Sequence, residues 1–484
     1  MCGRNCAIMP RQPRKTSFFK ALTMKPSRGA RFFQMAVIAL LVSTAAQTAT
    51  ATITVVESKT HTVLLNVINA AGTDISDAPA GAAAIAPPPG WPFPPADGSK
   101  PSPIVGVYQD PDGTARGFTA VNPFTPNKGE LPTALGNSGF NWVQPYDVNS
   151  SGQLVGAVRS NGGGTRPLYA ATATGRGNVA AVGNLQSPSQ YVGSAATAVN
   201  NSSTPLIVGY YQRVGQQEQA FYTLWPGTGL TAPPSIAIPN AYSSRALSVN
   251  TPVGGAPTLV AGFYRPQTPQ GTPGNPRGFV YSVVDPKDPS KNSVKDIGRV
   301  VIPTIEPFDQ AHYVSINAKG EVAATQPVPT DSSTSYQAFL LDSTKETLNR
   351  IPIKPIGRFE DSFAAGISED GWVVGAMRDI DPQPNESKDS GFVWINGQTI
   401  DLSVYATKDG WTGITWALDV YTDPVTALGT QTGYIVGVGK WNGQQRSFVM
   451  ELTVQAIPEP QTYVMLGLGL LAIATLRMRR FRRS

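Results

Sequence analysis

The chain has 484 residues, of which 14% are charged, with 48 glycines, 43 prolines and a formal net charge of +6. Its only cysteines are Cys2 and Cys6, so disulfide stapling, thiolate catalysis and cysteine-ligated metal sites are excluded from the rest of the chain. The positive charge lies at the two ends, and the 25 basic against 32 acidic residues of 52–476 argue against a body that binds nucleic acid.

The first 51 residues have the pattern of an export signal. Eight basic and no acidic side chains precede a mostly apolar stretch at 32–42, and small residues follow as far as Ala51. This order predicts a signal peptide region over residues 1–51, with cleavage after Ala46 or Ala51. The apolar stretch is shorter than the ~20 residues that a permanent transmembrane helix needs.

Two short strands and a loop are predicted next. Residues 53–56 and 62–65 are rich in Val, Leu and Thr, which favours strands. We expect them to complete the sheet of the last repeat, because pairing the two ends of the chain would remove two free sheet edges. Residues 76–103 are rich in Ala, Pro and Gly, and are predicted to be a surface insertion that folding does not require.

Residues 365–402 are the clearest copy of a repeat. Ser368-Glu369-Asp370-Gly371 is a turn sequence, because short polar side chains bond to their own backbone and Gly tolerates a positive φ. Strand-forming runs follow at 372–377, 391–395 and 399–402, and Asn396-Gly397 is a strong hairpin signal. The segment predicts about four antiparallel strands.

The same order of a turn and strands occurs in seven copies. An Asn or an equivalent residue marks each turn: Asn69, Asn149, Asn200, Asn250, Asn317, Ser368 and Tyr421. Five copies have a Phe at one strand position, which is expected to face the core: Phe221, Phe279, Phe339, Phe392 and Phe448. Repeats of roughly fifty residues with four strands each predict an all-β fold, a seven-bladed β-propeller of antiparallel strands over residues 52–455.

This repeat resembles the HAF-type extracellular repeat, which has the pattern I-N-x-x-G-x-V-V-G, then A-F-x-W and D-L-G. The resemblance covers most of residues 66–452. It implies a protein that works outside the cell.

No catalytic motif is recognised, since Gly-x-Ser-x-Gly and His-Glu-x-x-His are both missing. Four acidic residues recur near the repeat strands and could converge on one mouth of the ring, although turn formation is the favoured interpretation: Asp147, Asp361, Asp370 and Asp419. Asp110–Gly113 and Asp379–Asp381 resemble the starts of calcium loops, and turn chemistry explains both. We therefore expect no catalytic residue, cofactor or metal.

Several tryptophans admit two interpretations. Trp225 and Trp394 follow the repeat Phe and are expected to pack neighbouring blades together. Trp411 and Trp441 lie beside glycine-rich turns and could stack on sugar rings, although packing is the favoured interpretation.

The C-terminal segment, residues 456–484, has three parts. Pro458-Glu459-Pro460 comes first, an apolar stretch at 463–476 follows, and the basic residues at the end are Arg477, Arg479, Arg480, Arg482 and Arg483. This order predicts a short transmembrane helix held by a cytoplasmic basic cluster. It resembles the PEP-CTERM sorting signal of Gram-negative bacteria. The resemblance implies an exosortase-type processing enzyme, a transient stay in the inner membrane, and export toward the cell surface or an exopolysaccharide matrix.

The leading hypothesis is an exported, non-enzymatic surface or biofilm-matrix protein that binds polysaccharide or protein through its propeller loops. One alternative is an extracellular polysaccharide lyase or glycosidase on a propeller scaffold, and another is a structural spacer. Fold alone does not decide among the three.

Overall fold

The structure is a computed structural model. It describes residues 52–63, 80–86, 103–109, 115–121, 133–135, 140–160, 165–170, 179–181, 191–224, 233–303, 313–329, 334–382 and 388–457. The predicted signal peptide, the transmembrane stretch 463–476 and the sorting residues from Pro458 onward lie outside the described residues, as do Asn69, Asp110–Gly113 and Trp225. Thr52–Ile457 forms one compact unit, so the strands continue two residues beyond the expected boundary at 455.

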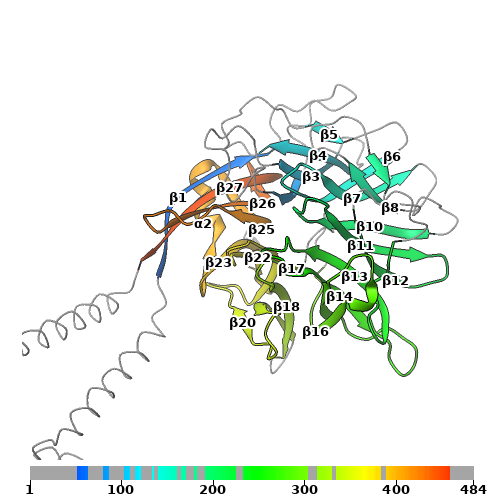
Figure 1. Cartoon of the computed structure of the whole chain (residues 1–484). Coiled ribbons are helices and arrows are strands. Elements are labelled where there is room, and N and C mark those ends of the chain that lie inside the picture. The colour runs from blue at the N-terminus through cyan, green and yellow to red at the C-terminus, as the bar shows by residue number, and fades with distance from the viewer. Residues whose placement is uncertain are drawn as a thin grey trace, which may run out of the picture. The chain divides into compact units, whose positions relative to one another are not determined.

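The described strands form seven antiparallel sheets in chain order (Figure 1). The first three sheets contain β2 (Ala80–Ile85), β3 (Pro103–Gln109), β4 (Ala115–Val121) and β5 (Thr133–Leu135); β6 (Phe140–Val148), β7 (Leu154–Ser160), β8 (Thr165–Ala170) and β9 (Val179–Ala181); and β10 (Tyr191–Val199), β11 (Leu206–Arg213) and β12 (Glu218–Leu224). The next two contain β13 (Ala241–Val249), β14 (Thr258–Pro266), β15 (Arg277–Val283) and β16 (Ser293–Arg299); and β17 (Val314–Ile316), β18 (Glu321–Pro329), β19 (Thr334–Asp342) and β20 (Arg350–Ile353).

The last two sheets lie toward the C-terminus. They contain β21 (Asp361–Ile367), β22 (Val373–Arg378), β23 (Asp389–Ile395) and β24 (Gln398–Asp401); and β25 (Trp411–Thr422), β26 (Thr430–Trp441), β27 (Gln444–Ile457) and β1 (Thr52–Thr62). Short helices connect some strands: η1 (Pro289–Lys291), α2 (Leu402–Ala406) and η2 (Thr407–Asp409).

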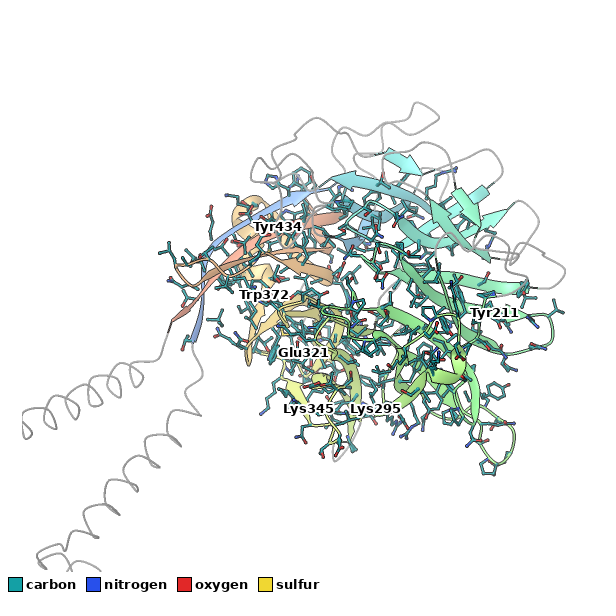
Figure 2. All side chains as sticks on the ribbon, viewed as in Figure 1. Tyr211, Lys295, Glu321, Lys345, Trp372 and Tyr434 are labelled. Carbon is teal, nitrogen blue, oxygen red and sulfur yellow. The ribbon has the colours of Figure 1, made fainter. Side chains whose placement is uncertain are left out.

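The sheets form a ring, because each packs on the next through an apolar cluster and the last packs on the first. One cluster joins Ala246 and Phe279 to Tyr222 of the preceding sheet, and another joins Tyr421 and Val449 of the last sheet to the first. Side chains fill the space between neighbouring sheets (Figure 2). The chain is therefore an all-β propeller, as the repeat predicted.

Six of the seven sheets have the four strands of a complete blade, and the β10–β12 sheet has three. An isolated bridge between Phe221 and Ser235 lies where a fourth strand would pair with β12. The seven expected repeats thus correspond to six four-stranded blades and one three-stranded sheet.

The expected pairing of the two ends is confirmed. β1 pairs with β27 from Thr52–Ile457 to Thr62–Phe448, so the N-terminal strand is the outer strand of the last blade. The strand predicted at 53–56 lies within this 11-residue strand, which also includes Thr62 of the strand predicted at 62–65; residues 64–65 lie outside the described residues. This pairing closes the ring with backbone hydrogen bonds between residues far apart in sequence.

A β-bulge in the innermost strand explains the glycine of the repeat. In six sheets the bulge begins at the residue that pairs with this glycine: Gly106, Gly156, Gly209, Gly262, Gly375 and Gly437. A Cβ added at any of the six would come closer than 3.0 Å to a backbone carbonyl oxygen of the innermost strand. Only glycine allows this close approach of two backbones.

The repeat Phe residues are core residues, as predicted. All five have 0% exposed surface, and so does Phe118 in the first sheet. Each lies in the third strand of its sheet, where it packs between neighbouring blades.

The prediction that residues 76–103 form a surface loop that folding does not require is wrong for Ala80–Ile85, while residues 76–79 and 87–102 lie outside the described residues. Ala80–Ile85 is strand β2, the innermost strand of the first sheet, and its six residues are buried. Its alanines resemble a loop in sequence because Ala has low β-propensity. In the structure, small side chains suit a strand that packs on the last sheet around a narrow centre.

Candidate functional site

The candidate site is formed by the turns that follow the innermost strands of the blades. In five of the described turns a polar side chain of the repeat accepts a hydrogen bond from the backbone of its own turn: Asn149, Asn200, Asn250, Asn317 and Ser368. Asn149 Oδ1 accepts from the N–H groups of Ser151 (3.1 Å) and Gln153 (3.0 Å), and Ser368 Oγ accepts from Trp372 N (3.1 Å). These bonds explain why Asn or Ser stands at this position.

The same Asn side chains also connect neighbouring blades. Asn149 Nδ2 donates to the carbonyl oxygen of Asn200 at 3.1 Å, and Asn200 Nδ2 donates to that of Asn250 at 3.2 Å. Asn317 Nδ2 donates to the carbonyl oxygen of Ser368 at 3.0 Å. These side chains are buried, so the Asn that marks the repeat in the sequence also forms a buried hydrogen bond between neighbouring blades.

The residue that follows each Asn forms a second set of contacts nearer the surface. Ser150 N donates to Asn201 Oδ1 at 2.6 Å, and Asn201 N donates to Thr251 Oγ1 at 3.0 Å. In the equivalent contact, Ala318 N donates to Glu369 Oε2 at 2.6 Å. Glu369 thus places a carboxylate where the other two contacts use an amide and a hydroxyl.

These turns surround a cavity of about 690 Å³, which we call the mouth cavity. Residues of all seven sheets and their turns line it: Ile85, Ser150, Asn201, Thr251, Val253, Ala318, Lys319, Ile367, Ser368, Glu369, Asp370, Val420, Tyr421 and Thr422. A smaller cavity of about 130 Å³ extends between the innermost strands, and it shares five lining residues with the mouth cavity: Ile85, Asn201, Thr251, Ile367 and Glu369. The mouth cavity is therefore the opening of the central channel.

Three of the four predicted acidic residues lie at this end of the channel. Asp370 lines the mouth cavity, and Asp147 and Asp419 line the smaller one. Asp361 lines neither; it begins β21, at the far end of that strand from Ser368, and accepts hydrogen bonds from Ser335 Oγ (2.8 Å) and Tyr336 N (2.7 Å).

Asp147 and Asp419 connect neighbouring blades. Asp147 Oδ2 accepts from Val199 N at 2.8 Å, and Asp419 Oδ2 accepts from Ile85 N at 2.9 Å. Each carboxylate also accepts the N–H of the next residue in its own strand. Both carboxylates satisfy backbone donors around the channel, which is a structural role close to the one favoured from the sequence.

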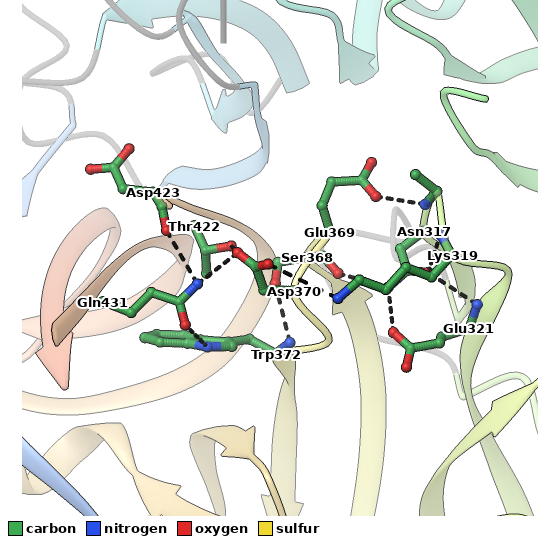
Figure 3. A network of polar contacts seen from close by, with 11 residues as sticks. Asn317, Lys319, Glu321, Ser368, Glu369, Asp370, Trp372, Thr422, Asp423 and Gln431 are labelled. Carbon is green, nitrogen blue, oxygen red and sulfur yellow. Dashed lines mark hydrogen bonds and ion pairs between the residues drawn. The ribbon is translucent and has the colours of Figure 1, made fainter. Parts of the chain in front are cut away.

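Asp370 is held by neutral donors and lies near one cation (Figure 3). Its Oδ2 accepts from Thr422 Oγ1 at 2.8 Å and from Gln431 Nε2 at 2.6 Å. Its Oδ1 lies 4.0 Å from Lys319 Nζ. Gln431 is itself oriented by the buried Trp372, whose Nε1 donates to Gln431 Oε1 at 3.1 Å.

Glu369 is the perturbed acid of the site (Figure 3). Burial raises the pKa of its carboxyl above the ordinary value, and the negative charges of Asp370 and Glu321 act in the same direction. The N–H of Ala318 and the ammonium of Lys319 oppose this rise in the pKa. Glu369 belongs to a turn sequence, and the sequence pattern alone does not mark it as a site residue.

The aromatic residues considered from the sequence, and Tyr421 of the mouth cavity, act mainly in packing. Trp411 and Trp394 are buried, and the Trp411 ring packs edge-on against Phe448 with ring centroids 5.9 Å apart. Tyr421, which lines the mouth cavity, stacks on Tyr434 at 4.8 Å. Burial, together with the neighbouring Tyr421, raises the pKa of Tyr434 far above its ordinary value, so its hydroxyl stays protonated.

The calcium-like sequence at Asp379–Asp381 forms a turn. Asp379 Oδ1 accepts from Asp381 N at 3.0 Å, and Asp379 Oδ2 lies 3.5 Å from Arg358 Nε. Within the described residues, no group of three or more His, Cys, Asp or Glu side chains is placed to hold a metal ion. In the same part of the chain, no helix has the length and apolar character needed to cross a membrane.

Residues 456–480 match the PEP-CTERM protein-sorting motif. The match includes Pro458, Glu459, Pro460 and the first three arginines of the basic end, and its first two residues are the end of β27. It confirms the sorting motif predicted from the sequence, and it implies an exported protein that an exosortase-type enzyme processes and that is held transiently in the membrane. No curated protein sequence matches the chain.

Several solved structures are distantly similar. A subtype N11 neuraminidase-like protein of A/flat-faced bat/Peru (H18N11) is 6% identical, with 85% of this chain and 97% of that chain covered and a TM-score of 0.39. The polysaccharide lyase Uly1 is 10% identical, with 72% and 87% covered and a TM-score of 0.34. The Trypanosoma rangeli sialidase is 9% identical, with 88% and 62% covered and a TM-score of 0.33. At these scores the similarities carry no argument about function.

Proposed function

We propose that this exported propeller is a non-enzymatic surface or matrix protein that binds a polysaccharide in the mouth cavity. The observation that supports the proposal is the mouth cavity itself, which is lined from all seven sheets and has a volume of about 690 Å³. Ligand-binding cavities in proteins typically have volumes of roughly 300–1,000 Å³. The cavity is therefore large enough for a few sugar rings.

The lining supplies both kinds of contact that a sugar needs. Hydroxyl and amide groups come from Ser150, Asn201 and Thr251, and a sugar hydroxyl can both donate to them and accept from them. Val253, which is 70% exposed, offers apolar surface to the C–H faces of a ring. A bound sugar would in this way form hydrogen bonds with the polar lining and pack its C–H groups against the apolar lining.

Asp370 is the residue expected to contribute most to orientation. Its carboxylate is fixed by Thr422 and Gln431, so a ligand hydroxyl would meet a preorganised acceptor. Lys319, at 4.0 Å, places a cation on the same side of the cavity.

The tail and the repeats complete the proposal. Exosortase-type processing of the tail would take the body from the inner membrane to the cell surface or the extracellular matrix, where exopolysaccharide is available. We assign the repeats to the HAF type that they resemble, and we count the β10–β12 sheet as a seventh blade.

A glycan array probed with the purified full chain tests the proposal. Binding of a defined set of glycans is expected, and Asp370→Asn should weaken that binding by about tenfold or more, because it removes a charged acceptor without changing the side-chain shape. Asp288→Asn is the matched control, since Asp288 caps the exposed helix η1. Array binding that Asp370→Asn leaves unchanged would contradict the mouth as the site, and a lack of any binding would favour the structural spacer.

An enzymatic role is the second candidate, and one observation favours it. Glu369 has a raised pKa and adjoins Asp370 at the same cavity, and a pair of carboxyl groups of which one has a raised pKa is a combination that glycosidases use. Incubation of each bound glycan with the chain, followed by chromatography, separates the two candidates. Product formation that Glu369→Gln abolishes while binding persists would establish the enzyme.

A further inference from the structure

A third cavity, of about 450 Å³, lies between the β13–β16 sheet and the β17–β20 sheet, and we call it the inter-blade groove. Hydroxyl groups of Ser282, Ser293, Ser343 and Thr344 are part of its lining. Ala318 and Lys319 line both the groove and the mouth cavity, so the two cavities adjoin at this turn.

The charges in the groove have one sign. Its two charged lining residues are Lys295, on strand β16, and Lys319, in the turn after β17. Although Lys319 Nζ lies 4.0 Å from Asp370, that carboxylate belongs to the lining of the mouth cavity and not to that of the groove. An anionic group therefore fits the groove better than a cationic one.

Lys295 is held in a fixed position. Its Nζ donates to the carbonyl oxygen of Ser343 at 2.9 Å and to that of Lys345, which lies close by in Figure 2. An ammonium has three N–H donors, and these two carbonyl oxygens take two of them. The third remains for a ligand, and a cation that is already ordered loses little side-chain entropy on binding.

We propose that the inter-blade groove is a second subsite, which binds an acidic segment of a linear polysaccharide whose neighbouring sugars occupy the mouth cavity. A carboxylate or sulfate group on the chain pairs with Lys295 and Lys319, and sugar hydroxyls meet the serine and threonine hydroxyls. This inference rests on the proposed function of the mouth cavity. It adds that the ligand is a polymer, since it spans two adjoining cavities, and that the polymer is acidic.

The experiment uses the full chain and saccharides of defined length. Titration calorimetry compares galacturonate oligomers of two and of ten units with neutral malto-oligosaccharides of the same lengths. The ten-unit acidic chain is expected to bind at least tenfold more tightly than the neutral chain of equal length, and added salt should reduce the difference. Equal affinity for the acidic and neutral ten-unit chains would overturn the acidic subsite while leaving a sugar-binding mouth in place.

Two variants test the groove itself. Lys295→Gln removes the cation, and Ser293→Tyr fills the groove from an exposed position on strand β16 without needing the core to repack. Each should weaken binding of the ten-unit acidic chain by about tenfold, the effect expected for one charge-assisted hydrogen bond, and leave binding of the neutral two-unit oligomer unchanged.

Lys345→Gln is the matched control, because its side chain is 72% exposed and does not line the groove. Should Lys295→Gln fail to fold, Ser293→Tyr still decides the outcome. Full affinity of Ser293→Tyr for the ten-unit acidic chain would overturn the second subsite. Failure of the unmodified chain to bind any saccharide would overturn the proposed function together with this inference.

Discussion

Gly375 pairs with the innermost strand of its blade at the point where that strand bulges, and replacing it with alanine tests the packing that sets the shape of the mouth. A Cβ at this position would approach the carbonyl oxygen of Phe363 closer than 3.0 Å, its carbonyl carbon to 2.9 Å and Phe392 Cε1 to 3.0 Å. Ordinary contacts of carbon with oxygen begin near ~3.3 Å, so strands β21 and β22 would have to separate.

Overpacking a well-packed interior typically costs about 1–3 kcal/mol. The added atom meets backbone on one side and a fully buried ring on the other, so neither can move aside cheaply. We therefore expect Gly375→Ala to reduce the free energy of unfolding by about 3 kcal/mol. Urea unfolding followed by tryptophan fluorescence measures the loss, since Trp372 and Trp394 are buried in the same blade.

Gly193→Ala is the matched control. An added Cβ there would meet no atom nearer than 4.0 Å, so its midpoint should stay the same or rise slightly. Ala324 is the residue equivalent to Gly375 in the β17–β20 sheet, and the pairing of β17 with β18 has no register shift. Alanine therefore occurs at this position in a sheet whose innermost strand pairs without a bulge. If the urea midpoint of Gly375→Ala were as high as that of Gly193→Ala, the close approach of the two strands would not explain why the repeat has glycine at this position.

Three further changes have defined outcomes. Phe392→Ala should cost about 3–5 kcal/mol in urea unfolding because the ring is fully buried, and an unchanged midpoint would contradict the blade alignment. Because the pKa of Glu369 is raised in the folded state, the free energy of unfolding should fall as the pH rises from the ordinary pKa of 4.5 through the raised one. Urea unfolding curves measured over a pH series should show this fall for the unmodified chain and not for Glu369→Gln. The same pH dependence in both proteins would contradict a raised pKa of Glu369. Replacing Pro458-Glu459-Pro460 with three alanines should trap full-length protein in the inner membrane, and fractionation showing normal processing would contradict their role in sorting.

The fold was largely predictable because the repeat combines local signals with a constant period. Hairpin and turn residues such as Asn396-Gly397 set the strand boundaries, and Phe392 and its equivalents occupy one face of a strand. The pairing of β1 with β27 was predictable from the cost of leaving two sheet edges unpaired.

Strand β2 could not be predicted in this way. Its sequence, Ala80–Ile85, has a single β-branched residue, Ile85, after five Ala and Gly residues of low β-propensity, and its burial depends on contacts with the last sheet, far away in sequence. Tertiary packing here overrides local propensity.

The candidate site was only partly predictable. Asp147, Asp370 and Asp419 recur at equivalent turns and strands, so a common mouth could be expected. The environment of Glu369 could not, because its hydrogen bond comes from Ala318 in the neighbouring blade. The one available signal was an acidic residue directly after the repeat position, where the other copies have Ala, Ser, Asn or Thr.

The most direct test of the mouth as the binding site is to block it without disturbing the fold. Val253 lines the mouth cavity and is 70% exposed, so Val253→Trp can fill the opening without a change in the core. Val425→Trp, at a residue 61% exposed outside the mouth lining, is the matched control. Calorimetric titration of both variants with the best glycan from the array should show at least a tenfold loss of affinity for Val253→Trp and none for Val425→Trp. Equal affinities of the two variants would contradict binding at the mouth.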